Sequence, residues 1–133
     1  MSEANVELAK RFHEAQRGDI EVAMEFVAED VIAIEFGDRV DTPNVFHGRA
    51  EWLAYYGQAG EVFDNYAREI DEWVDAGDWV IAVGRWTGKG KLSGVPVEGR
   101  AVNAARWRDG VIVEYLFGFA SREAALAAVR SRQ

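Results

Sequence analysis

An Asp-Gly turn between two apolar runs constrains this chain more than any other feature. Asp109 and Gly110 separate residues 97–107 from residues 111–119, and both runs are rich in β-branched and aromatic side chains. Such a dipeptide is a strong hairpin signal because the tight turn needs positive φ, which glycine adopts at little cost. Ser121 precedes an alanine-rich segment and can cap its N-terminus. The C-terminal part therefore predicts a β-hairpin followed by a helix.

The rest of the chain predicts helices first and strands afterwards. Asn5 and Asp19 suit the caps of two helices that Gly18 separates, and the second helix is expected to end at Glu29 and Asp30. The other expected elements are a strand at 31–36, a loop at 37–45, a helix at 48–59, and strands at 65–74 and 79–87. This order indicates an α+β fold, and a length of 133 residues predicts one domain spanning residues 1–133.

Composition argues against several classes of protein. The chain carries a net charge of −8 and its arginines are scattered, so a phosphate-binding surface for nucleic acid is not expected. It has no cysteine, which excludes disulfides and thiolate metal sites. No apolar run approaches the ~20 residues of a membrane span, and no secretion leader is evident. We therefore expect a cytoplasmic protein that binds neither nucleic acid nor membranes.

The last strands are apolar on both faces. In residues 111–119, Val113 and Tyr115 fall on one parity while Ile112 and Leu116 fall on the other, and residues 79–86 repeat this pattern. An antiparallel sheet with one face in water would alternate apolar and polar residues instead. We expect one face to enclose the interior and a second copy of the chain to cover the other, which predicts a homodimer through the sheet.

Several segments together resemble the SnoaL-like branch of the NTF2-like superfamily. They are residues 11–35, Phe46 to Arg49, Asp75 to Asp78, and residues 93–128. The resemblance covers nearly the whole chain and implies a strongly curved antiparallel sheet wrapped around the N-terminal helices as a cone, with a C-terminal helix. The mouth of that cone would be the pocket. The fold hosts isomerases, cyclases, hydrolases and plain binding modules, so it does not fix the function.

Glu35 is the first candidate for chemistry. It ends the apolar run 31–34 and precedes Phe36. Apolar neighbours disfavour the charged form of a carboxylate, which suits a general base. In the resemblance, Glu35 occupies the position of the catalytic aspartate of the ketosteroid isomerases. The alternative is a solvated glutamate at the end of a strand.

Asn103 is the second candidate. It lies between Val102 and Ala104 in a strand that should be mostly buried, and an unpaired buried amide costs ~1–3 kcal/mol. In the resemblance, it stands where the isomerases hold the acid that stabilises an oxyanion. An asparagine there can donate a hydrogen bond but no proton. The alternative is an amide satisfied by its neighbours in the sheet.

Arg85 is the third candidate. It shares the parity of Trp79 and Ile81, which we interpret as the inward parity. The similar limonene epoxide hydrolases have an arginine here and an aspartate two residues later, where this chain has Thr87. Arg85 is therefore expected to bind a carboxylate or enolate without the rest of that triad. The alternative is an arginine at the surface or at a dimer interface.

No complete catalytic set of these relatives is present. Phe12 stands nearest the position where the isomerases carry a tyrosine, and the final strand lacks the carboxylate of the polyketide cyclases. His13 and His47 have no suitably spaced carboxylate partner, so we predict no metal site. No redox or other cofactor is implied.

Aromatic residues are numerous for so short a chain. Most must belong to the core, and several are expected to line the cone as a slot for a flat apolar ligand. The rings expected there are Phe12, Trp52, Tyr55, Tyr56, Trp107, Phe117 and Phe119. The sequence thus predicts binding of a small, mostly apolar, polyketide- or steroid-like molecule, with isomerase or cyclase chemistry by Glu35. The alternative is a non-catalytic dimeric module that binds a ligand or another protein.

Overall fold

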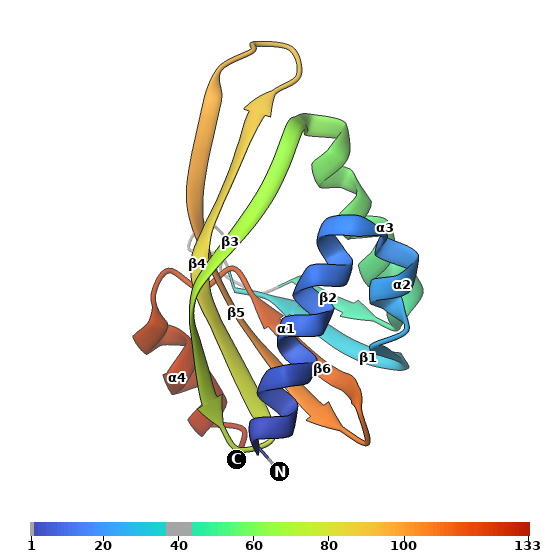
Figure 1. The fold of residues 1–133 in the computed structure, drawn as a ribbon, viewed down its shortest axis with the longest axis vertical. Coiled ribbons are helices and arrows are strands. Elements are labelled where there is room, and N and C mark those ends of the chain that lie inside the picture. The colour runs from blue at the N-terminus through green and yellow to red at the C-terminus, as the bar shows by residue number, and fades with distance from the viewer. Residues whose placement is uncertain (1, 37–43) are drawn as a thin grey trace.

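The computed structural model describes residues 2–36 and 44–133 of the chain (Figure 1). Helices and strands follow one another in an α+β order, as predicted. Their bounds are α1 Ser2–Gly18, α2 Ile20–Met24, β1 Val27–Glu35, β2 Asn44–His47, α3 Arg49–Val62, β3 Phe63–Ala76, β4 Trp79–Gly90, β5 Pro96–Arg108, β6 Val111–Phe117 and α4 Arg122–Arg130. None of the described helices is long and apolar enough to cross a membrane.

The strands form one curved, six-stranded sheet. Its order is β2-β1-β6-β5-β4-β3. The expectation of an antiparallel sheet holds for every described pair except β1 with β6, which run parallel. This pair joins strands far apart in the chain, and long connections with helices allow parallel pairing, whereas tight hairpins do not.

Local signals in the sequence correctly predicted the turn and two helix caps. Asp109 and Gly110 adopt φ values of 53° and 82°, as a tight hairpin turn requires. The Asp19 carboxylate accepts a hydrogen bond from the Glu21 backbone N–H at 2.9 Å, at the start of α2. Ser121 Oγ likewise accepts from the Ala124 N–H at 3.1 Å and caps α4.

Some predicted boundaries were wrong. Helix α1 begins before Asn5, and α2 ends at Met24 rather than at the acidic pair. Strand β1 begins at Val27, which pairs with Ile112 of β6. The pairing with a buried strand outweighs the helical spacing that the sequence suggested. Residues 37–43 of the expected loop lie outside the described residues, and its last two residues belong to β2.

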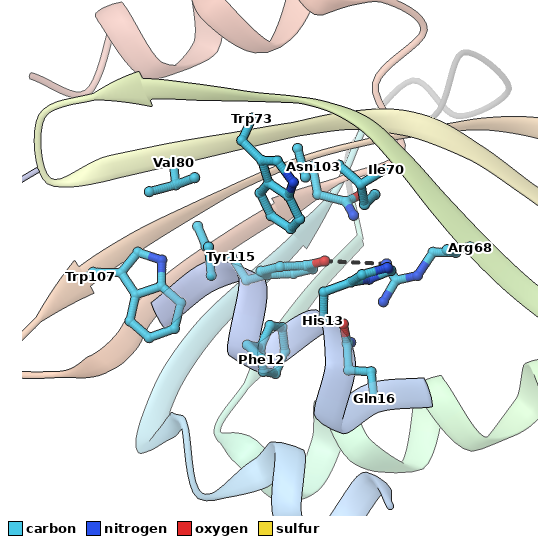
Figure 2. A pocket seen from close by; sticks show the side chains of 13 residues that line it. Phe12, His13, Gln16, Arg68, Ile70, Trp73, Val80, Asn103, Trp107 and Tyr115 are labelled. Carbon is cyan, nitrogen blue, oxygen red and sulfur yellow. Dashed lines mark hydrogen bonds between the residues drawn. The ribbon is translucent and has the colours of Figure 1, made fainter. Parts of the chain in front are cut away.

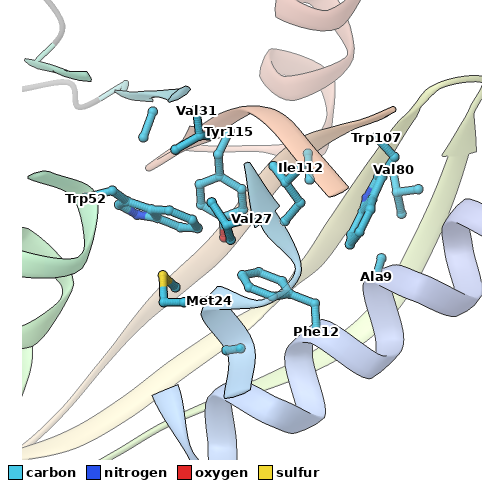
Figure 3. Close-up of a cluster of buried hydrophobic side chains, with 13 residues drawn as sticks. Ala9, Phe12, Met24, Val27, Val31, Trp52, Val80, Trp107, Ile112 and Tyr115 are labelled. Atoms are coloured by element: carbon cyan, nitrogen blue, oxygen red, sulfur yellow. The ribbon is translucent and has the colours of Figure 1, made fainter. Parts of the chain in front are cut away.

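Two hydrophobic cores lie on opposite faces of the sheet. Consecutive residues alternate between them: Val80 and Tyr115 belong to the core under α1, α2 and α3, whereas Ile81 and Leu116 belong to the core under α4. Figure 1 shows α4 on one side of the sheet and the other helices on the opposite side. Phe12, Trp52 and Tyr115 meet in the first core (Figure 3).

The second core corrects the argument for a dimer. The second apolar face of the last strands packs against Ala125 and Val129 of α4, within the same chain. A second subunit is therefore not needed to cover these residues. The homodimer stays a prediction, which light scattering at tens of micromolar protein tests.

Candidate functional site

A cavity of about 510 Å³ opens between α3 and the concave face of the sheet. This volume lies within the ~300–1,000 Å³ that is typical of sites for small organic ligands. Aromatic side chains from α3, β3, β4 and β6 supply much of its wall: Trp52, Tyr55, Tyr56, Phe63, Tyr66, Trp86, Tyr115 and Phe117. The wall of this cavity is thus largely aromatic.

Most of these rings form two groups in mutual contact. On the α3 and β6 side, the ring centroids of Trp52 and Tyr115 are 4.6 Å apart, and those of Tyr115 and Phe117 are 5.8 Å apart. On the β3 and β4 side, the Tyr66 and Trp86 centroids are 5.8 Å apart. Such contacts favour a defined orientation of the rings that make them.

Glu35 lies at the end of β1 and lines this cavity. Its two carboxylate oxygens have different partners. The Tyr55 hydroxyl of α3 donates to Oε2 at 2.5 Å, and the Asn44 amide of β2 donates to Oε1 at 2.9 Å. Burial raises the pKa of the Tyr55 phenol, and the hydrogen bond to Glu35 raises it further. Tyr55 is therefore a protonated donor that orients the carboxylate.

Asn103 lines the same cavity from β5 and is 8% exposed. With its amide oxygen toward β3 and β6, Oδ1 accepts from Arg68 Nη1 and from the Tyr115 hydroxyl, both at 3.0 Å. The amide nitrogen then donates to the Val102 carbonyl at 3.1 Å. The alternative, an amide satisfied by its neighbours in the sheet, agrees with these hydrogen bonds, and a role of Asn103 toward a ligand stays a prediction.

Arg68 was not predicted as a site residue from the sequence. This residue extends from β3 into the cavity, where its guanidinium lies beside the Tyr115 hydroxyl (Figure 2). It also lies over the Tyr56 ring, 5.9 Å from the centroid. A signal was present, because Arg68 shares the parity of Tyr66 and Ile70 on a strand whose other parity is acidic. An arginine on the apolar parity of a strand indicates a cation that faces the interior.

Arg85 does not line the cavity, which corrects the expectation that its parity faces inward. Trp79 and Ile81, on which that expectation was based, pack under α4 on the opposite face. The Arg85 side chain is 59% exposed, and its guanidinium pairs with Glu69 at 3.1 Å across β3 and β4. Its exposed position agrees with the alternative interpretation of Arg85 as an arginine at the surface.

Phe119 also lies outside the cavity. Strand β6 ends at Phe117, and Gly118 adopts a φ of 83°, which turns the chain. Phe119 is consequently buried under α4, where its ring stacks on Phe36 with centroids 4.8 Å apart. Two residues of equal parity thus reach opposite faces of the sheet.

Phe12 and Trp107 line a smaller inner compartment of about 30 Å³. Figure 2 shows Arg68, Asn103 and Tyr115 in the wall of this compartment. The same three residues also line the large cavity. His13 lies in the smaller compartment with its ring against Trp73, and its pKa is lowered by burial and by the nearby arginines, so it is neutral at pH 7. Of the predicted site residues, the cavity brings together Glu35, Asn103, Trp52, Tyr55, Tyr56 and Phe117.

This arrangement of helices over a curved sheet with a pocket at its concave face is the NTF2-like α+β fold. The model of the SnoaL-like domain matches residues 9–115, and the chain therefore belongs to the SnoaL-like family. No curated protein matches the sequence.

Solved structures agree with the fold. An NTF2-like protein of Burkholderia thailandensis superposes with a TM-score of 0.76 at 24% identity, covering 97% of both chains. IdmH, a proposed polyketide cyclase of Streptomyces antibioticus, gives 0.73 at 24% identity over 95% of this chain and 98% of its own. AclR, a proposed hydroxylase of Streptomyces galilaeus, gives 0.75 at 15% identity over 98% of both chains.

Proposed function

We propose that the cavity binds a small, flat, mostly apolar molecule, polyketide- or steroid-like, and that Glu35 removes a proton from a carbon beside its carbonyl. The observation that carries this proposal is that Glu35 and Asn103 line one open, aromatic-walled cavity. The polyketide-like class is further supported by the similarity to IdmH.

In the proposed reaction, Glu35 acts as general base. Removal of a proton next to a carbonyl places negative charge on the carbonyl oxygen, and donors aimed at that oxygen lower the barrier. The amide nitrogen of Asn103 already donates to Val102. Arg68 is therefore the better candidate to stabilise the developing oxyanion, while Asn103 and Tyr115 hold its guanidinium in place.

A specific observation favours the alternative, a binding module without catalysis. Both oxygens of the Glu35 carboxylate already accept hydrogen bonds, from Tyr55 and from Asn44. A substrate C–H group would have to approach an oxygen that these donors engage. In this second function, Glu35 orders the cavity wall and the ligand is only carried.

Deuterium exchange separates the two functions without knowledge of the natural substrate. The probe is 2-tetralone, a flat ketone with exchangeable protons beside its carbonyl, followed by proton NMR in D₂O. We expect the protein to accelerate exchange and Glu35→Gln to slow it by about 100-fold or more, the typical contribution of one positioned base. Glu69→Gln, on the outer face, is the control and should exchange at the parent rate.

Two outcomes would contradict the proposal, one its catalytic part and the other its binding part. If 2-tetralone binds but exchange is no faster than in buffer, the catalytic part is wrong and the binding module remains. If neither 2-tetralone nor the neutral ester methyl 2-naphthoate binds at millimolar concentration, binding of a flat apolar ligand is itself wrong.

A further inference from the structure

The Arg68 guanidinium carries an uncompensated positive charge at the inner end of the cavity. Among the described residues, no carboxylate lies within ion-pair distance of it, whereas Arg85, Arg106 and Arg122 each pair with an acidic side chain. Arg68 is partly buried, and its partners Tyr115, Asn103 and Tyr56 are neutral. Withdrawing a guanidinium from water without a counter-charge is costly, so a compensating anion is expected.

Some N–H groups of the Arg68 guanidinium have no acceptor among the described residues. Its hydrogen bonds to Tyr115 and Asn103 both come from Nη1. Within residues 2–36 and 44–133, Nε and Nη2 donate to no acceptor. A guanidinium presents paired N–H groups that match the two oxygens of a planar oxyanion, and Arg68 retains such donors.

The compartment next to Arg68 adds two buried donors that have no acceptor among the described residues. The side-chain nitrogens Gln16 Nε2 and Trp107 Nε1 line the adjoining compartment and are buried without an acceptor in the described part of the chain. The amide oxygen of Asn103 is already engaged by Arg68 and Tyr115. Donors without partners favour a ligand group that only accepts hydrogen bonds, and a carboxylate is such a group.

We propose that the ligand of this cavity carries a carboxylate, and that Arg68 binds it through its free N–H groups. This inference rests on the binding part of the proposed function and not on its catalytic part, because donors of Arg68 that hold a carboxylate are not free to stabilise an oxyanion beside Glu35. It specifies the class of ligand: a flat, mostly apolar carboxylic acid. The local positive charge at Arg68 offsets the unfavourable effect of a chain with net charge −8 on an anion.

The sheet register fixes how such a ligand would lie. Phe117 is the pairing partner of Glu35, and Tyr115 lies two residues earlier on the same strand face. Two residues of a strand span about 7 Å. The carboxylate would bind at the Tyr115 end beside Arg68, and the apolar body would extend past Phe117 toward Glu35.

A pair of probes that differ only in charge tests this proposal. The probes are 2-naphthoate and its neutral methyl ester, with affinities measured by titration calorimetry. We expect the parent protein to bind the acid more tightly than the ester. Arg68→Met should weaken binding of the acid by about 10- to 100-fold, the range for hydrogen bonds to charged groups, and weaken binding of the ester much less, so that the preference for the acid is lost. Arg85→Met, an exposed arginine of the same sheet, should change neither affinity.

The outcomes separate this inference from the proposed function. If the ester binds as well as the acid, or if Arg68→Met keeps the preference for the acid, the inference is overturned while flat-ligand binding stands. If neither probe binds, both fail. Circular dichroism checks that Arg68→Met folds, and if it does not, Arg68→Lys decides. Lysine keeps the charge but lacks the paired donors, so a smaller preference for the acid supports the proposal, and an unchanged one overturns it.

Discussion

The hydroxyl of Tyr55 donates a 2.5 Å hydrogen bond to Oε2 of Glu35 and so links helix α3 to the end of strand β1. Both side chains line the same cavity. Asn44 completes the arrangement from β2 by donating to Oε1 at 2.9 Å. The candidate base is thus oriented by α3 and β2, two elements whose contact with Glu35 the sequence does not predict.

The raised pKa of Tyr55 predicts that the protein loses stability at high pH. Burial and the hydrogen bond to Glu35 raise the pKa of Tyr55 above its unfolded value, which is about 10. The folded state therefore keeps a proton that the unfolded state releases, so the free energy of unfolding falls as pH rises above about 10. Urea unfolding at pH 8 and at pH 11 should show a smaller fall for Tyr55→Phe than for the parent protein. An equal fall in both proteins would contradict this assignment.

Asn103 should contribute to stability through the groups it satisfies. Asn103→Ala leaves the donors of Arg68 and Tyr115 without their shared acceptor inside the cavity wall. We expect a loss of about 1–3 kcal/mol in the free energy of unfolding, measured with urea at pH 7. Asn5→Ala is the matched control, because Asn5 makes only an exposed 3.4 Å contact to the Gly77 carbonyl. If the two variants were equally stable, the role of Asn103 in the wall would be refuted.

Substitution by alanine should lower the stability of the protein at Gly84 and raise it at Gly57. A Cβ at Gly84 would lie 1.8 Å from the Glu69 carbonyl oxygen, where β3 and β4 approach closely. Overpacking of this kind costs about 1–3 kcal/mol or more. Gly57 lies in α3, with no atom within 4 Å of the added Cβ, so Gly57→Ala should stabilise by about 0.5–1 kcal/mol. Thermal unfolding followed by circular dichroism compares both variants, and a stable Gly84→Ala protein would contradict the packing argument.

The sequence predicted features whose causes are local. The Asp109-Gly110 turn and the Ser121 cap depend on neighbouring residues only, and both are confirmed. The prediction that Arg85 faces the cavity was wrong for a physical reason. Strand periodicity shows which residues share a face of the sheet, but not which face encloses the cavity. That choice depends on where α1 and α4 dock, which involves contacts distant in sequence. The apolar parity of its strand could have marked Arg68 as facing the interior, but the cavity that it lines follows only from how the helices dock on the sheet.

Alanine substitutions at Phe117 and Phe119 should have different effects, the first mainly on ligand binding and the second mainly on stability. The two rings are two residues apart, but Gly118 turns the chain between them, so Phe117 lines the cavity and Phe119 is 5% exposed under α4. Phe119→Ala leaves a void in a packed core and should lower the free energy of unfolding by about 3–5 kcal/mol. The folded fraction should keep its affinity for methyl 2-naphthoate, because no wall of the cavity changes. Phe117→Ala should cost less stability and weaken that affinity, since it removes a ring from the slot. Urea unfolding and calorimetry on both variants give the comparison, and the assignment of the two faces is wrong if Phe119→Ala is the variant that loses the ligand.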